Sequence, residues 1–291
     1  MRSEAERTAR LVWQFGEPVH AVTYFAPETR AATDALGLKG GWMSYFGCRA
    51  APLGAVPPTV VTATFYNFRP SMVERAIPDA WSYASPEELV DARWSAVDRA
   101  LQRLLGDEVA SSKVRTAAEL GRAAVESGNF DGRLMGRANA SLAPPAEPHL
   151  VLWQALTALR EHRGDGHVIT LVSHGVKPCE ALVLQTATGR SPEETMQANR
   201  GWTDEEWGAA KDALTERGWL DDAGAITPDG AAARDEIERE TDRLAATAVA
   251  GLGPDRTMEL VDALRPLAER VMDAGEVPSA NNMGVPWPPQ E

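Results

Sequence analysis

The chain has few cysteines and no long apolar run. Its 291 residues include two cysteines, Cys48 and Cys179, which lie far apart in the sequence. Two thiols provide neither a disulfide framework nor a four-thiolate zinc site. No stretch approaches the roughly 18 apolar residues of a membrane span, and the charged start of the chain lacks a signal-peptide pattern. We therefore expect a cytoplasmic protein that does not contact a membrane.

Basic residues are also scarce. The sequence contains 29 Lys and Arg against 42 Asp and Glu, which gives a net charge of -13. Such a surface repels nucleic acid and anionic lipid unless a local basic patch opposes it. A glycine-rich phosphate loop and a Gly-x-Ser-x-Gly elbow are both missing from the sequence. We therefore predict no cofactor.

The strict alternation typical of strands is nearly absent. Ala-rich segments with apolar positions three and four apart dominate instead, so the predicted class is mainly α. The length suggests two domains, and a proline-containing stretch at 141–148 is the best linker candidate. The predicted units are an N-terminal, degenerate winged-helix-like domain at 1–140, a C-terminal winged-helix domain at 147–277, and a Pro-rich tail at 278–291.

The strongest fold signal lies in residues 191–247. Ser191 and Thr203 are typical helix N-caps, and Thr227 begins a long helix. Residues 219–227 predict two very short strands around a glycine turn, which would form a β-wing. This order of helix, turn, helix, wing and long helix resembles the winged helix of MarR-type regulators.

An approximate internal repeat is also present. Residues 17–20 return as 147–149, and 37–39 return as 175–177, in the same order. We therefore expect tandem, MarR-like winged-helix repeats, with a small β-wing in the second. The alternative is that Ala-rich helices produce such matches by chance.

Three further segments carry a resemblance that covers the whole chain. They are residues 17–25, 61–68 and 160–167. With them the chain resembles an actinobacterial family of helix-turn-helix proteins of uncertain function. The resemblance implies a tandem winged-helix-like α protein, and it implies no established reaction.

The charge of the expected recognition helix opposes DNA binding. The helix begins with three acids at 204–206, and its wing offers Asp221 and Asp222 but no arginine. A groove-reading helix needs basic residues beside the phosphates, although an acidic start also satisfies the helix dipole. In the first repeat, Arg69 and Arg75 are too few to decide. We therefore expect DNA to be an unlikely partner.

Aromatic residues are concentrated near the N-terminus. Twelve of the nineteen lie in the first 83 positions, where they could line a pocket for a planar or hydrophobic ligand or form a large aromatic core. Polar residues interleaved with the rings favour a pocket. The predicted ligand-binding residues are Arg49, Phe65, Asn67, His149, Trp153, Arg160 and His167.

Two histidines each have an aromatic partner four residues later. They are His20 with Tyr24 and His149 with Trp153, and a real repeat would bring the two faces together around a cavity. Histidine titrates near neutral pH and a tyrosine hydroxyl can donate to an oxyanion, so His20 and Tyr24 are the candidate catalytic pair. The alternative is a buried structural histidine.

Residues 160–167 form the most distinctive local string. We expect one helix to end at 163, the glycines at 164 and 166 to form a turn, and Asp165 to cap the next helix, so capping and dipole complementarity explain most of the string. His162, Asp165 and His167 supply three types of metal ligand, but their spacing across a turn is unlike that of helical zinc sites, so we predict no metal. Arg160 is instead a candidate for holding a ligand carboxylate or phosphate.

The leading functional hypothesis is a small-molecule-binding protein on a winged-helix scaffold that has lost DNA binding. Its apolar or aromatic ligand would lie between the two halves. One alternative is an enzyme of natural-product metabolism that uses His20 and Tyr24. A second is a ligand-responsive, MarR-like transcriptional regulator. The expected partner is a small molecule, and the chain itself is expected to be a monomer or a homodimer.

Overall fold

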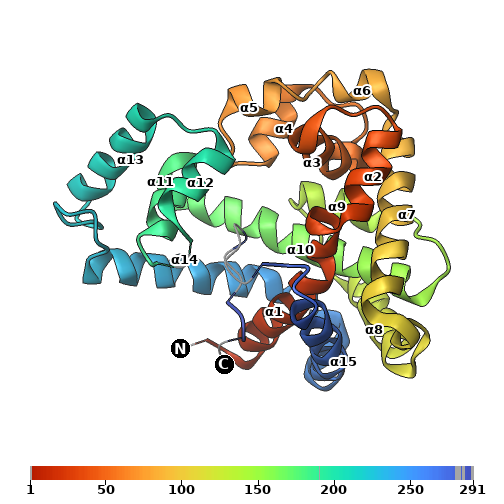
Figure 1. The fold of residues 1–291 in the computed structure, drawn as a ribbon. Coiled ribbons are helices and arrows are strands. Elements are labelled where there is room, and N and C mark those ends of the chain that lie inside the picture. Colours follow the sequence, from red (N-terminus) through yellow and green to blue (C-terminus); the bar gives the residue numbers. More distant parts are fainter. Residues whose placement is uncertain (1, 190, 279–282, 284–285, 290–291) are drawn as a thin grey trace.

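The computed structural model describes residues 2–189, 191–278, 283 and 286–289, and this part of the chain is mainly helical, as predicted (Figure 1). Its α-helices are α1 (Glu4–Phe25), α2 (Pro27–Ala35), α3 (Gly40–Ala50), α4 (Pro58–Thr64), α5 (Pro70–Glu74), α6 (Ala80–Tyr83), α7 (Pro86–Leu105), α8 (Ser112–Ser127), α9 (Leu134–Ala140), α10 (Pro148–Ser173), α11 (Pro178–Thr186), α12 (Glu193–Arg200), α13 (Asp204–Glu216), α14 (Pro228–Ala246) and α15 (Gly253–Asp273). The short 3-10 helices are η1 (Ala51–Leu53), η2 (Gly106–Ala110) and η3 (Ala250–Leu252). Within the described ranges, no helix combines the length and the apolarity needed to cross a bilayer.

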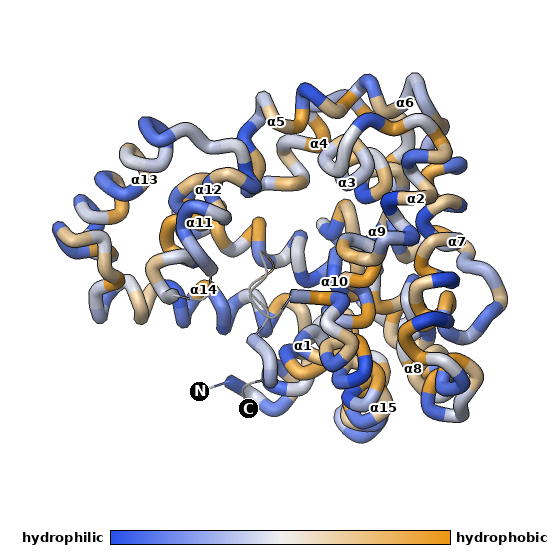
Figure 2. The backbone as a smooth tube through the Cα atoms, in the orientation of Figure 1, coloured by the Kyte–Doolittle hydropathy of each residue, from blue (hydrophilic) through white to orange (hydrophobic). Residues whose placement is uncertain are grey.

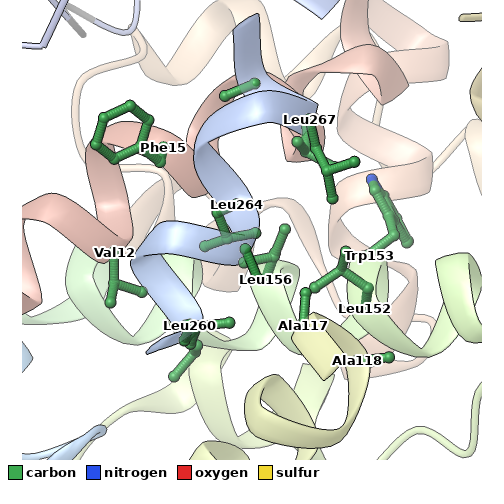
Figure 3. Close-up of a cluster of buried hydrophobic side chains, with 14 of the residues drawn as sticks. Val12, Phe15, Ala117, Ala118, Leu152, Trp153, Leu156, Leu260, Leu264 and Leu267 are labelled. Atoms are coloured by element: carbon green, nitrogen blue, oxygen red, sulfur yellow. The ribbon is translucent and has the colours of Figure 1, made fainter. Parts of the chain in front are cut away.

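Helix α10 is the centre of the fold. It packs against α1, α8, α9 and α14, and α1 also packs against α15. Figure 3 shows the core that joins these helices, where Leu156 of α10 lies beside Leu264 of α15, between Phe15 of α1 and Trp153 of α10. Burying one large apolar side chain contributes about 1.5–3 kcal/mol, so this cluster holds the first, central and last helices together.

A second core lies beneath α3, α4 and α5. Phe46, Phe65 and Phe68 are buried there, with ring centroids 4.9 Å apart for Phe46 and Phe68 and 6.1 Å apart for Phe46 and Phe65. Figure 2 shows hydrophobic and hydrophilic residues mixed along most helices, as expected for amphipathic helices that bury one face. The aromatic residues near the N-terminus therefore do form a core.

Helices α11, α12 and α13 form a smaller unit with its own core (Figure 1). Thr203 caps α13 in a capping box with Glu206, and Thr227 caps α14, as the sequence predicts. Gly201 ends α12 with a φ of 77°, a left-handed conformation that only glycine adopts readily. Buried Met196 and Trp207 pack the two helices together across this turn.

The predicted β-wing is not supported. Within the described residues no strand forms, and residues 219–227 contain a single antiparallel bridge between Leu220 and Ile226. The Asp221 carboxylate accepts hydrogen bonds from the backbone of Ala223 and Ala225 and so closes the turn, and α13 and α14 leave only residues 217–227 between them. The tandem MarR-like repeats are not supported either, because the described residues of neither half contain a wing.

A further correction concerns α10. The glycines at 164 and 166 predict a break between helices at 148–163 and 167–174, with Asp165 as the second cap, but the structure has one continuous helix. Gly166 allows a close approach, since a Cβ there would lie 3.4 Å from the Cβ of Leu244. Asp165 instead accepts a hydrogen bond from the backbone of Gly136, 2.9 Å away, at the start of α9. Tertiary packing thus outweighs the low helix propensity of glycine.

The prolines of the tail at 278–291 predict that it is not helical. Its described residues, 278, 283 and 286–289, contain no helix, and the rest of the prediction lies outside the described residues.

Candidate functional site

A cavity of about 640 Å³ lies between the aromatic N-terminal helices and the helices of the C-terminal half. Residues of α1, α3 and α4 line one side, and residues of α10, α11, α12 and α14 line the other. Two of the lining rings, Phe25 and Trp42, are 38% and 37% exposed, so the cavity opens to solvent beside them. The volume is typical of small-molecule sites, which span about 300–1,000 Å³.

Aromatic side chains form one wall of this cavity. They are Trp13, Tyr24, Phe25, Trp42, Tyr45, Phe65, Tyr66 and Phe68. Tyr45 connects several of them, with its ring centroid 5.4 Å from that of Tyr24, 5.7 Å from Trp42 and 5.5 Å from Phe68. These contacts hold the rings in fixed orientations, so one set of side chains serves as core on one side and as cavity wall on the other.

Buried ion pairs form the floor of the cavity. Arg49 donates two hydrogen bonds of 2.9 Å to Glu161, and Arg160 lies 3.1 Å from the same carboxylate. Arg160 also lies 3.4 Å from Glu17. Burial alone would raise the pKa of Glu161, but Arg49 and Arg160 outweigh it and hold that pKa well below its ordinary value. At Glu17 the effect of burial is larger than that of Arg160, so the pKa of this carboxyl is raised.

A second ionic cluster lies beside α14. Arg163 contacts Asp242 at 2.7 Å and Glu238 at 3.7 Å, and the Nδ1 atom of His167 lies 3.0 Å from the hydroxyl of Thr241. Burial lowers the pKa of His167. Burial opposes ionisation of Glu238, but His167, Arg163 and other cations lower its pKa to about 2. Asp242 and Glu238 therefore share the arginines of this cluster, since Arg10 also contacts both of them.

His20 is buried and lies against Tyr24, which lines the larger cavity. His20 is 2% exposed, and its ring nitrogens lie 3.0 Å from the Thr157 hydroxyl and 3.1 Å from the Tyr24 hydroxyl. Burial, followed by the charge of Arg160, lowers the pKa of His20 well below its usual value, and burial raises the pKa of Tyr24. The pair is thus neutral and satisfied, and it lines a smaller cavity of about 150 Å³ that shares Tyr45 and Arg49 with the larger one. Catalysis by this pair stays a prediction.

The two histidine-plus-aromatic faces do not enclose a cavity between them. His20 and Trp153 stack directly, with ring centroids 5.8 Å apart, and the indole nitrogen of Trp153 donates to the carbonyl of His20. His149 points elsewhere, since its Nε2 lies 2.6 Å from the carboxylate of Asp98 on α7.

The predicted site residues are thus divided among three places. Those that line the larger cavity are Tyr24, Arg49, Phe65, Asn67, Arg160 and His167. His20 lines the smaller cavity, which Tyr24 and Arg49 line too, and His149 and Trp153 line neither of the two. The structure therefore brings most of the predicted residues to one cavity, while ligand binding by them stays a prediction.

Sequence reasoning missed the acidic side chains of the cavity. Glu17, Glu161 and Glu238 all line it, and none was proposed as a site residue. A weak signal existed at Glu17, which precedes a proline inside an otherwise apolar helix segment. The partner of Glu161 could not be read from the sequence, because Arg49 is 112 positions away.

The candidate metal ligands at 162–167 do not converge. His162 contacts the carbonyl of Asn129 at 2.9 Å, Asp165 contacts α9, and His167 contacts α14. Burial lowers the pKa of His162 to about 4 and raises the pKa of Asp165 to about 6. In the part of the chain that the structure describes, no three His, Cys, Asp or Glu side chains are placed to share a metal ion.

The turn between α12 and α13 is docked on the N-terminal half. The indole nitrogen of Trp202 donates to the carbonyl of Asn67 at 3.0 Å, and the backbone N–H of Arg69 donates to the carbonyl of Arg200 at 3.0 Å. The Arg69 side chain also pairs with Glu206 at 2.9 Å. Helices α12 and α13 are therefore fixed against the loop at 65–69, which carries part of the aromatic wall.

Comparison with known protein families agrees with this arrangement of helices. The profile of a helix-turn-helix family matches residues 9–278, so the chain belongs to that family. The match supports neither the MarR-like assignment nor an actinobacterial one. No curated protein and no solved structure matches the chain.

Proposed function

We propose that this helix-turn-helix family member is a small-molecule-binding protein that holds an apolar or aromatic ligand in the larger cavity. The observation that carries the proposal is the cavity itself, which has the volume of a ligand site, an aromatic wall and a floor of arginines and carboxylates. Flat rings offer stacking surfaces, and the few polar groups would orient the ligand. Exposed Phe25 and Trp42 mark the entrance.

The proposal includes the loss of DNA binding. Helix α13, the expected recognition helix, begins with acids at 204–206, which would face the phosphates of a duplex. Its preceding turn is also held by the contacts of Trp202 with Asn67 and of Arg69 with Glu206. Both features oppose insertion of α13 into a major groove.

A neutral dye tests ligand binding directly. N-phenyl-1-naphthylamine becomes fluorescent in apolar surroundings, and we expect the wild-type protein to bind it in the micromolar range. Ala181 lines the cavity from α11, whereas Ala232 is exposed on α14. We expect Ala181→Trp to weaken dye binding by about fivefold or more because the new ring occupies the cavity, and Ala232→Trp to leave the affinity within about twofold.

Two results would contradict the proposal. One is the absence of dye binding by the folded wild-type protein. The other is an equal effect of the two tryptophan substitutions, which would place the dye outside the cavity.

A ligand-responsive transcriptional regulator is the second candidate, because membership of a helix-turn-helix family favours it. Fluorescence anisotropy with labelled random-sequence duplex DNA at low salt separates the two. A regulator gives a salt-dependent rise in anisotropy, since phosphate contacts release counterions. The proposed function predicts no rise.

A further inference from the structure

Arg93 is a buried arginine that forms no ion pair. It lies on α7, is 5% exposed, and has its guanidinium group 5.2 Å from the centre of the Trp153 ring. Throughout residues 2–189 and 191–278, no carboxylate lies within 4 Å of this group. Burial lowers the pKa of Arg93, but an arginine starts from a pKa of about 12.5 and stays charged at neutral pH. Burying an unpaired charge is costly, so we expect a counter-ion beside Arg93.

The guanidinium group of Arg93 is also incompletely hydrogen-bonded. Its Nη1 atom donates to the carbonyl of Cys48 at 3.3 Å and its Nη2 atom to the side-chain oxygen of Asn139 at 3.4 Å, both longer than usual. Its Nε atom is buried with no hydrogen-bond partner. The thiol of Cys48 does not supply the missing charge, because burial raises its pKa to about 11 and keeps it neutral. Arg93 therefore lacks both a counter-ion and an acceptor for Nε.

The smaller cavity, of about 150 Å³, leads from the surface to Arg93. Its lining includes the exposed residues Phe25 and Arg30 as well as buried Arg93. Helix α2 packs against α7 (Figure 1), and Thr29 of α2 lines the cavity with a hydroxyl that is buried without a hydrogen-bond partner. Since one water takes up about 30 Å³ in the liquid, the cavity holds a small ion with a few waters and is too small for a typical ligand.

The other charged side chains of this lining are already paired. Arg30 lies 2.8 Å from Asp34, and Arg49 donates two hydrogen bonds of 2.9 Å to Glu161. Glu161 favours the charged form of Arg93, but it acts from beyond 4 Å and makes no contact with it. Among the described lining residues, Arg93 is thus the charged group that has no partner of its own.

We infer that the smaller cavity binds a small monovalent anion beside the guanidinium group of Arg93. The anion accepts a charge-assisted hydrogen bond from the Nε–H group, which is stronger than a neutral one, and it balances the buried charge. The volume of the cavity limits the anion to a few heavy atoms. The inference concerns a different cavity from that of the proposed function and does not depend on it.

Thermal unfolding in two sodium salts tests the inference. Formate is small enough for the cavity and gluconate is not, and a constant total salt concentration keeps the ionic strength fixed. We expect the melting temperature of the wild-type protein to be about 3 °C higher in about 100 mM formate than in gluconate, because an anion that binds only the folded state stabilises it. The melting temperature should also rise with the logarithm of the formate concentration.

Substitutions then locate the anion. Arg93→Gln removes the charge beside the cavity, and we expect the difference between the two salts to fall below about 1 °C. The matched control, Arg30→Gln, removes the same charge at the exposed end of the same cavity, and we expect it to keep the difference of about 3 °C. Each variant is compared with itself in the two salts, so a change in its basal stability does not affect the result.

Carbon-13 NMR of labelled formate measures binding to the wild-type protein without any substitution. We expect the protein to broaden the formate signal, because bound formate tumbles with the protein. An excess of gluconate should leave this broadening unchanged.

Three results would overturn the inference. The first is the same melting temperature of the wild type in formate and in gluconate, and the second is a sharp formate signal; either would leave only water beside Arg93. The third is an equal formate effect in Arg93→Gln and in the wild type, which would place the anion elsewhere. If Arg93→Gln does not fold, the two wild-type measurements decide.

Discussion

Asp242 is a buried anion on which three arginines converge, and its removal gives a prediction of stability. The residue is fully buried, and its carboxylate lies 2.6 Å from Arg2, 3.1 Å from Arg10 and 2.7 Å from Arg163. The substitution Asp242→Asn keeps the shape of the side chain and removes its charge. It leaves positive charge that Glu238, which contacts Arg10 and Arg163, and Asp235, which contacts Arg2, balance only in part.

The magnitude follows from burial. Breaking a buried ion pair by removing one partner typically destabilises a protein by about 3–5 kcal/mol. We expect a value near the lower end, about 3 kcal/mol, because Arg10 and Arg163 keep Glu238 as a partner at 3.0 Å and 3.7 Å. By contrast, Arg122 and Glu126 form an exposed pair at 3.7 Å, so Glu126→Gln should cost less than about 0.5 kcal/mol.

Urea unfolding followed by circular dichroism measures both variants. With an m-value of about 3 kcal/mol/M, the midpoint for Asp242→Asn should fall by about 1 M, while that for Glu126→Gln should hardly move. A loss below about 1 kcal/mol for Asp242→Asn at an unchanged m-value would refute the assignment of this carboxylate as the anchor of the cluster.

Two further substitutions probe the packing and the titration of α10. A Cβ on Gly136 would lie 2.8 Å from the backbone of His162, so Gly136→Ala should lower the melting temperature and cost about 1–3 kcal/mol of stability. The control is Gly208→Ala within α13, where a Cβ meets open space, and this substitution should be neutral or stabilising. Equal melting temperatures of the two variants would contradict the expectation. Burial lowers the pKa of His162 to about 4, so the unfolded chain, with a pKa near 6.5, binds the proton first as the pH falls. Between pH 6.5 and 5.0 the wild type should therefore lose about 1.5 kcal/mol more unfolding free energy than His162→Gln, and parallel pH profiles from urea titrations would rule this out.

The helical class and several helix starts could be predicted because their causes are local. The capping box of Thr203 with Glu206 and the cap at Thr227 depend on residues within one turn, and the structure has both. The break in α10 was predicted wrongly, because Gly166 packs against Leu244 from a distant helix and no local pattern reveals that contact. The wing prediction failed within the turn itself, where the carboxylate of Asp221 accepts the backbone hydrogen bonds of Ala223 and Ala225.

The types of residue in the site could be predicted from the sequence, but the ion pairs that they form could not. The aromatic residues and Arg160 stand out in composition, and they line the cavity. The neutralising carboxylate of Glu161 joins Arg49 across more than a hundred positions, and His149 pairs with Asp98 on another helix. The packing of helices decides which of these side chains meet, and a single sequence does not reveal that packing.

The docked turn between α12 and α13 has a consequence for motion. To swing α13 outward, the protein must break the Trp202 contact with Asn67, the backbone bond from Arg69 to Arg200, and the Arg69 pair with Glu206. Each such bond is worth about 0.5–1.5 kcal/mol, so the opening free energy is on the order of 3 kcal/mol. At equilibrium, the conformer with α13 swung outward would then make up less than about one molecule in a hundred.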